Sequence, residues 1–264
     1  MSLKRKIPVL ILAAAALPLL ALSWTKARVE NRNRIDESNF PRTILWAWER
    51  EEDLEFLDPQ QFAVAFLAQT LVMKGDEVTL EPRRQPLKVR PETKLIAVTR
   101  IESQKTTGAP VALSQSQRER LVNLVLKTRE LKNVAAIQID FDATTSEREF
   151  YRSLLHDLRA KLPDNVPLSM TALASFCVND RWVRDLPVDE AIPMVFRMGT
   201  DNKAIKSFLA NGNDFSEPIC RRSYGIAVDE PVTTTFAGSR RRYIFNVRAW
   251  TEADVLPFQR ETRQ

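Results

Sequence analysis

Three polar side chains alternate with apolar ones in the stretch AAIQIDFDATTSEREFY, residues 135–151. Successive side chains of a strand point to opposite faces, so Gln138, Asp140 and Asp142 share one face. Two carboxylates on one face, roughly 7 Å apart by the rise of a strand, raise each other's proton affinity where water is excluded. Such a pair suits acid catalysis of glycosidic bond cleavage, and it equally suits oxygen coordination of a divalent cation.

A helical pattern follows this strand. Ser146 is the expected N-cap, Glu147 and Glu149 occupy the first turn, and Leu154 and Leu158 belong to the buried stripe. A strand that runs into a helix places the two carboxylates at the carboxyl end of the strand.

The rest of the chain also alternates between strand and helix patterns. The expected strands are residues 43–48, 62–71, 95–101, 134–141, 168–174, 191–197, 223–228 and 243–247. The clearest helices between them are residues 114–131, 146–162, 175–185 and 202–210. Such alternation implies parallel pairing, and about eight repeats predict an α/β fold of the (β/α)8 TIM-barrel type.

Two stretches depart from this pattern. Residues 74–76 predict a hairpin turn, followed by a short strand at 77–80 where a helix would be expected. Residues 233–239 offer little helix before the last strand. The barrel is therefore expected to be trimmed or irregular, with an open doubly wound sheet as the second choice.

Polar residues collect at the carboxyl ends of several predicted strands, where the active sites of such barrels lie. They include Arg100, Glu102, Gln138, Asp140, Asp142, Ser169, Thr171, Arg197 and Asn246. Burying them unpaired would cost about 1–3 kcal/mol each, so a wet, hydrogen-bonded pocket is expected. The alternative is a structural salt-bridge network, in which Arg100 or Arg197 pairs with Asp140.

Tryptophans provide a further signal for the same end of the barrel. Trp46 and Trp48 lie on the first strand and Trp250 lies just beyond the last, and these strands become neighbours when a barrel closes. Their faces suit stacking on sugar rings. Packing in the core or at the rim is the alternative.

The composition excludes several classes of enzyme. His156 is the only histidine, so a Ser-His-Asp or Cys-His mechanism and a histidine-rich metal centre are not expected. With six glycines and no glycine-rich phosphate loop, a nucleotide-binding enzyme is not expected either. We therefore assign no metal site and no cofactor.

The N-terminus predicts export. Three cations at residues 4–6 precede an apolar run that ends in small residues. We assign residues 1–23 to a signal peptide, 24–41 to a polar linker and 42–264 to a single domain. An uncleaved membrane anchor is the alternative for the first segment. The expected location is periplasmic or extracellular.

The net charge and the two cysteines bear on the partners and the location of the protein. The formal net charge of +5 includes the three N-terminal cations and leaves +2 for the rest, too little to indicate nucleic acid. Contact with a membrane is expected only through an uncleaved signal segment. In an oxidising compartment Cys177 and Cys220, the only two cysteines, are candidates for one disulfide, with two buried free thiols as the alternative.

Several runs of the sequence together resemble a bacterial family of unknown function, domain of unknown function 3142. The runs are TILWAWER, AVAFLAQTL, AVTRIE, QIDFDATTSEREFYRSLL, LSMTALASFC and LPVDEAIPMVFRMG. They extend from Thr43 to about Val247. The resemblance implies an exported bacterial protein without an assigned activity.

One strand is also similar to the fourth strand of family 18 glycoside hydrolases, whose motif alternates Asp-x-Asp-x-Glu. Gln138, Asp140 and Asp142 occupy the three places. The resemblance implies that Asp142 is the general acid and that Asp140 orients it. Gln138 and Asp142 depart from the motif, and the sixth strand, MVFRMG, carries no tyrosine-aspartate pair.

These observations lead to two hypotheses for the domain. In the first it is a glycoside hydrolase acting on a cell-envelope or extracellular glycan. Asp142, Asp140 and Glu102 are then catalytic, Glu49 is an alternative second carboxylate, and Arg100, Gln138, Arg197, Trp48, Thr171 and Asn246 bind substrate. In the second the same face binds a glycan or a protein without catalysis, because fold alone does not decide function.

Overall fold

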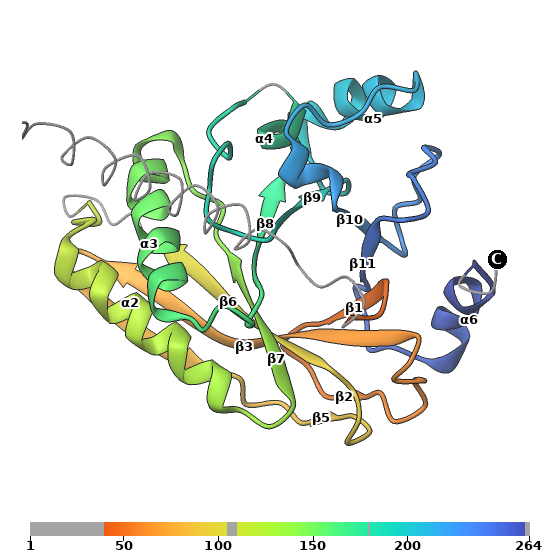
Figure 1. The fold of residues 1–264 in the computed structure, drawn as a ribbon, viewed down its shortest axis with the longest axis horizontal. Helices are drawn as coiled ribbons and strands as arrows, with labels where there is room; N and C mark the ends of the chain where they lie inside the picture. The colour runs from red at the N-terminus through yellow and green to blue at the C-terminus, as the bar shows by residue number, and fades with distance from the viewer. Residues whose placement is uncertain (1–39, 105–109, 179, 262–264) are drawn as a thin grey trace, which may run out of the picture. The chain divides into compact units, whose positions relative to one another are not determined.

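The computed structural model describes residues 40–104, 110–178 and 180–261, and a parallel β-barrel lies at the centre of this part (Figure 1). The barrel strands are β1 (Thr43–Ala47), β3 (Phe62–Lys74), β6 (Leu95–Ser103), β7 (Val134–Asp140), β8 (Leu168–Leu173), β9 (Glu190–Met194), β10 (Ser223–Ala227) and β11 (Arg241–Phe245). β1 pairs in parallel with both β3 and β11, which closes the ring. The predicted (β/α)8 barrel is confirmed, and it is closed rather than open.

Helices follow most of the strands. They are α2 (Gln115–Lys127), α3 (Arg148–Lys161), α4 (Ala174–Val178), α5 (Asn202–Ala210) and α6 (Glu252–Glu261), with the short 3-10 helices η2 (Thr128–Glu130), η3 (Thr145–Glu147), η4 (Gly199–Asp201) and η5 (Pro218–Arg221). Figure 1 shows α2 and α3 side by side next to β6 and β7. Their apolar stripes join the outer core of the barrel.

The helix predicted over residues 175–185 is wrong in length, because α4 ends at Val178. Trp182 lies 5.3 Å, centroid to centroid, from the Phe176 ring and meets its edge. Residues six apart in one continuous helix lie on different faces, so this contact requires the helix to stop.

The hairpin predicted after the second barrel strand, in place of a helix, is confirmed. β4 (Glu77–Pro82) pairs antiparallel with β3 through a hairpin, where a helix would stand in a regular barrel. Gly75 in its turn has φ of 54°, a left-handed conformation that glycine adopts without strain. A second, two-stranded sheet joins β2 (Glu52–Asp53) to β5 (Leu87–Lys88).

The period of two along each strand divides the buried residues into two cores. On β1, Ile44 and Trp46 belong to a cluster inside the barrel, whereas Leu45 and Ala47 belong to the cluster between barrel and helices. Gly225 on β10 makes room for the inner tryptophan, because a Cβ there would lie 3.0 Å from Cη2 of Trp46. The barrel interior is therefore tightly filled below its mouth.

The loop after β7 is fixed by a cap other than the one expected. Thr144, not Ser146, forms the capping box with Glu147. The Thr144 backbone N–H donates to Oε2 of Glu147 over 2.7 Å, and the Thr144 hydroxyl donates to the same oxygen over 2.6 Å. A single turn of 3-10 helix precedes α3, and the N-cap lies two residues earlier than the sequence pattern predicts.

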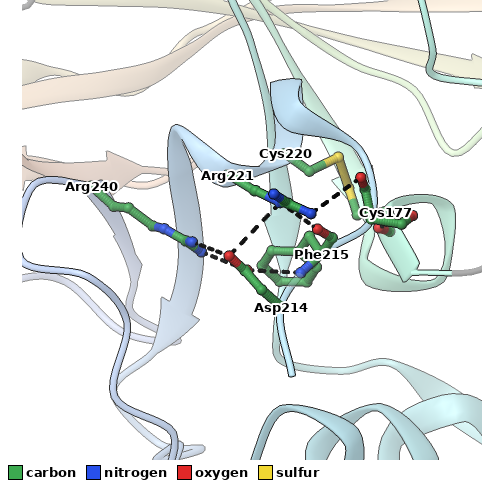
Figure 2. Close-up of a disulfide and its surroundings, with 7 residues drawn as sticks. Cys177, Asp214, Phe215, Cys220, Arg221 and Arg240 are labelled. Carbon is green, nitrogen blue, oxygen red and sulfur yellow. Dashed lines mark hydrogen bonds and ion pairs between the residues drawn. A yellow bond between two sulfur atoms is a disulfide. The ribbon is translucent and has the colours of Figure 1, made fainter. Parts of the chain in front are cut away.

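A disulfide joins Cys177 in α4 to Cys220 in η5, with their Cα atoms 5.9 Å apart (Figure 2). Both cysteines are fully buried. Figure 2 also shows Arg221 and Arg240 meeting at Asp214 beside this bond. The predicted pairing of the two cysteines is confirmed, and the bond ties the segment after β8 to the segment before β10.

The expected signal peptide and most of the linker lie outside the described residues. Within the described part of the chain, no helix combines the length and the apolar character needed to cross a membrane. The same part holds no group of three or more His, Cys, Asp or Glu side chains placed to bind a metal ion.

Candidate functional site at the mouth of the barrel

β6 and β7 bring the predicted acidic residues together. Arg100 on β6 pairs in register with Asp140, the last residue of β7, and Asp142 follows two residues later. Ile139 and Phe141 point the other way, into the outer core. The alternation expected from the sequence is therefore present, and the carboxylates stand at the carboxyl end of the barrel.

Asp140 is buried and has two partners. The Thr171 hydroxyl on β8 donates to its Oδ1 over 2.6 Å, and Nη1 of Arg100 lies 3.6 Å from its Oδ2. Burial raises the pKa of the Asp140 carboxyl above its ordinary value, because it penalises the ionised form. The hydrogen bond from Thr171 opposes this shift, and the charge of Asp142 adds to it.

Asp142 is exposed and has no hydrogen-bond or ion-pair partner among the described residues. Partial loss of solvent raises the pKa of its carboxyl, and the nearby Arg100 guanidinium lowers it in part. An accessible carboxyl with a raised pKa keeps its proton to a higher pH than an ordinary aspartate.

Arg100 connects the remaining parts of the site. Its Nε donates to Oε1 of Glu102 over 2.7 Å, and its guanidinium lies 5.8 Å from the centroid of the Trp48 ring. Both Arg100 and Glu102 are partly exposed. The predicted network between Arg100 and Asp140 is thus present, and it lies within a hollow that is open to solvent.

Two cavities meet at Arg100, Asp140 and Asp142. The polar cavity, of about 290 Å³, is also lined by Ile101, Glu102, Ser103, Phe141, Thr144 and Glu147. The aromatic cavity, of about 170 Å³, is also lined by Trp46, Trp48, Thr171, Met194, Phe196, Arg197 and Phe245. Asp142, the exposed member of these three residues, is therefore open to a ligand in either cavity.

One wall of the polar cavity is a continuation of the sheet. β7 ends at Asp140, opposite Arg100, whereas β3 and β6 stay paired up to Met73 and Ser103. Glu102 stands on this projecting pair of strands. Side chains held by a sheet are positioned more accurately than side chains on a loop.

Most residues predicted to bind a ligand line these cavities. Trp48, Thr171 and Arg197 line the aromatic cavity. Arg197 has φ of 51°, and its guanidinium lies 5.0 Å from the centroid of Phe245 and 3.6 Å from Oδ2 of Asp229.

Gln138 and Asn246 line neither of these two cavities. Gln138 is fully buried in the barrel, where it accepts from Nε1 of Trp46 over 2.9 Å and donates to Oγ of Ser169 over 3.2 Å. Asn246 is also buried, and its Nδ2 has no acceptor among the described residues. The structure places both residues beneath the surface that a ligand would touch.

The remaining carboxylate and aromatic residues considered for the site lie outside both cavities. Glu49 is exposed and lines neither cavity. Trp250 is buried and donates its Nε1 to the backbone oxygen of Trp46 over 2.9 Å, so it packs against the barrel. His156 is exposed on α3.

The residues predicted from the sequence do not include several that line or support the site. Phe196 and Phe245 stack 5.6 Å apart in the aromatic cavity. Phe245 ends β11 and Phe196 lies two residues beyond the end of β9, so the period of two could have indicated both. Arg83 has no such signal. Its guanidinium donates to the backbone oxygens of Trp48 and Arg50, and thereby fixes the loop after β1.

The sequence matches one family model. The model described as Domain of unknown function (DUF3142) matches residues 90–187, a stretch that includes Arg100, Asp140 and Asp142. This match confirms the sequence resemblance over that stretch. No curated protein matches the chain.

Three solved structures illustrate the likeness of fold. A family GH18 chitinase from Chromobacterium violaceum aligns with a TM-score of 0.52 at 12% identity, over 85% of this chain and 84% of that chain. The catalytic domain of a family GH18 chitinase from the fern Peteris ryukyuensis gives 0.49 at 11%, over 83% and 98%. The chitinase domain of the spore coat protein CotE from Clostridium difficile gives 0.38 at 16%, over 58% and 49%, so the chain spans about half of that structure. The first of these alignments supports the barrel fold.

Proposed function

We propose that the protein breaks a glycosidic bond in a cell-envelope or extracellular glycan, with Asp142 as the proton donor. The observation that carries the proposal is the position of Asp142, an exposed carboxyl that lines both cavities and has no hydrogen-bond or ion-pair partner in the described part of the chain. Its raised pKa suits donation of a proton to the glycosidic oxygen. The fold of the chitinases supports the proposal only as an architecture that can host such a site.

The neighbouring residues take supporting roles in this proposal. Asp140, held by Thr171, is the orienting residue, and the guanidinium of Arg100 lowers the pKa of both carboxyls in part. Glu102 lines the polar cavity and is the second carboxylate, in preference to Glu49. Trp48 offers part of its face to a sugar ring.

Export is part of the same proposal. Residues 1–23 carry the features of a signal peptide, residues 24–41 form a linker, and residues 42–264 form the working domain. The disulfide supports an oxidising compartment, because such bonds are rare in the cytosol of most organisms.

A non-catalytic protein that binds a glycan or another protein is the second candidate. Gln138, at the place of the first acid in the glycoside hydrolase motif, cannot titrate, and Trp46 and Ser169 hold its amide. The ion pairs of Arg100 with Asp140 and Glu102 also suit a site that only holds a ligand.

Product release from a panel of glycans separates the two candidates. The panel contains peptidoglycan, N-acetylglucosamine oligomers and exopolysaccharides, and mass spectrometry detects the products. The proteins compared are the parent, Asp142→Asn and the control Asp201→Asn, whose carboxylate is exposed and makes no side-chain cap bond.

Each outcome bears on one part of the proposal. Cleavage by the parent and the control, but not by Asp142→Asn, supports a glycosidase with this proton donor. Cleavage by Asp142→Asn removes that residue from the mechanism. Binding without cleavage favours the second candidate, and the absence of both contradicts a glycan ligand.

A further inference from the structure

Arg197 is the more available of the two cations that line the aromatic cavity. The other is Arg100, whose Nε donates to Oε1 of Glu102 over 2.7 Å. Among the described residues, the guanidinium of Arg197 makes no hydrogen bond, and Asp229 is the one carboxylate within ion-pair distance, at 3.6 Å. The side chains of this pair are 53% and 45% exposed. An exposed pair at that distance contributes little, so a ligand can take its place.

The backbone of Arg197 is held in an unusual conformation. The residue follows β9 by three positions and has φ of 51°, a left-handed value that costs free energy in a residue with a Cβ. Its N–H donates to Oε2 of Glu230 over 2.9 Å, and Nζ of Lys206 donates to Oε1 of the same carboxylate over 2.7 Å. Of the four non-glycine residues with positive φ in the described part of the chain, Arg197 alone lines either cavity. Strain at such a place indicates a function for the side chain.

The side chain of Arg197 lies against an aromatic wall. Its guanidinium is 5.0 Å from the centroid of Phe245. Trp48 meets the edge of the Phe245 ring with the centroids 6.3 Å apart, and Phe196 stacks on that ring. The cavity therefore combines an apolar surface, which suits the C–H face of a sugar, with a cation whose N–H donors are open to a ligand.

The acidic residues of the site stand apart from Arg197 around the barrel. Asp140 ends β7 and Arg197 follows β9, two strands away, which is about 10 Å along the barrel wall. β8 lies between them and carries Thr171, whose hydroxyl already donates to Asp140. Asp142 and Arg197 line the same cavity, so a ligand there can meet the proposed proton donor and the guanidinium at different points.

We propose that Arg197 binds a carboxylate carried by a sugar in the aromatic cavity, so that the substrate is an acidic glycan. This inference rests on the proposed action on a glycan. A guanidinium presents its N–H donors as a planar fork, and a carboxylate can accept from two of them at once. The carboxylate belongs either to a uronic acid or to the lactyl ether of muramic acid. A neutral sugar lacks this attraction, and a sugar with a charged amine is repelled.

The test measures binding of matched oligosaccharides to the Asp142→Asn protein, produced from the complete 264-residue sequence. This variant stops turnover under the proposed function and keeps Arg197. The first ligand pair is an oligogalacturonate and its methyl ester, whose carboxyls are neutral. The second pair is a peptide-free peptidoglycan strand, which carries lactyl carboxylates, and an N-acetylglucosamine oligomer of equal length, which carries none. Titration calorimetry measures each affinity at low and high salt.

Three further variants assign the preference to one side chain. Arg197→Gln removes the charge and keeps the backbone N–H that donates to Glu230. Arg197→Lys keeps the charge and loses the planar fork. Arg129→Gln is the control, because Arg129 is exposed and lines neither cavity. The neutral ligands report whether Arg197→Gln damages the cavity as a whole.

We expect the carboxylate ligand of at least one pair to bind roughly tenfold more tightly than its neutral counterpart, and we expect high salt to reduce this preference. Arg197→Gln should abolish the preference and leave the affinity for neutral ligands unchanged. Arg197→Lys should keep part of the preference, and Arg129→Gln should keep all of it. A preference in one pair alone identifies the sugar that presents the carboxylate.

Equal or tighter binding of the neutral ligand in both pairs would overturn the inference, as would a preference that survives in Arg197→Gln. Weaker binding of neutral ligands by Arg197→Gln would give Arg197 a structural role and would overturn it too. In each of these cases, cleavage of a glycan by the parent would leave the proposed function standing. No binding of any oligomer would overturn the inference, and together with no cleavage by the parent it would contradict the proposed function as well.

Discussion

The Thr171 hydroxyl donates to Oδ1 of Asp140 over 2.6 Å and joins β8 to β7 at the floor of the site. Neither side chain is exposed, so the bond replaces the water that the carboxylate loses on folding. The bond favours the ionised form of Asp140, against the burial that raises the pKa of its carboxyl, and the charge of Asp142 adds to that rise.

Thr171→Val should destabilise the protein. The variant keeps the shape of the side chain but leaves Oδ1 of Asp140 without its donor, at a cost of about 1–3 kcal/mol near neutral pH. Urea unfolding measures the loss, and Thr79→Val, exposed on β4, is the control. The loss should shrink in acid, because a protonated Asp140 depends less on the bond. Equal stability of the two variants would mean that the bond contributes little.

The Asp140 carboxyl should make stability fall as the pH rises. Its pKa in the folded protein is raised above 3.8, so the folded state binds the proton more tightly than the unfolded state. Stability from this group is complete below the unfolded pKa and is lost as the pH rises through the folded pKa. Asp140→Asn removes the effect, so the difference in unfolding free energy between variant and parent should move in favour of the variant from about pH 4 toward neutrality. A difference that is constant with pH would contradict the raised pKa.

Gly225→Ala should destabilise the barrel. The new Cβ would lie 3.0 Å from Cη2 of Trp46, and the indole cannot move freely because Gln138 holds its Nε1. Overpacking of this kind costs about 1–3 kcal/mol. Gly238→Ala is the control, since a Cβ there meets nothing within 4 Å. Urea unfolding of both variants measures the difference, and similar midpoints would show that the interior relaxes around the methyl group.

Loss of the disulfide should lower stability, because the bond restricts the unfolded chain. The bond spans 43 residues, and its removal should lower the free energy of unfolding by about 2–4 kcal/mol. The double variant Cys177→Ala with Cys220→Ala tests this in urea. Added reductant should destabilise the parent and leave the double variant unchanged, whereas a parent insensitive to reductant would contradict the prediction.

The barrel could be predicted from the sequence because the alternation of apolar and polar residues can be read along each strand by itself. Along β7 the apolar residues Ile137 and Ile139 alternate with Gln138 and Asp140, and this period of two assigns each side chain to a face before any partner strand is known. The same alternation placed Arg100 and Asp140 at one end of the barrel. The sequence pattern therefore predicted the position of the candidate site together with the fold.

The features that the sequence did not predict depend on contacts between residues far apart in the chain, or on two neighbouring residues that could both cap the same helix. Arg83 reaches the backbone after β1 from another part of the chain, and no pattern around it shows this. Thr144 and Ser146 are both suitable caps, and the reach of Glu147 back to Thr144 decides between them. Burial of Gln138 follows from barrel closure, which brings Trp46 within hydrogen-bond distance of it.

The paired ends of β3 and β6 form one wall of the barrel mouth, and this wall is already ordered before a ligand binds. β3 and β6 remain paired as far as Met73 and Ser103, so the backbone beneath Glu102 has given up its conformational freedom on folding. A ligand that binds along this wall therefore does not cost the protein further backbone entropy there. Most of the conformational entropy that is lost on binding at this wall is then the ligand's own. A stiff oligomer loses less of it than a flexible one, so this wall favours stiff ligands.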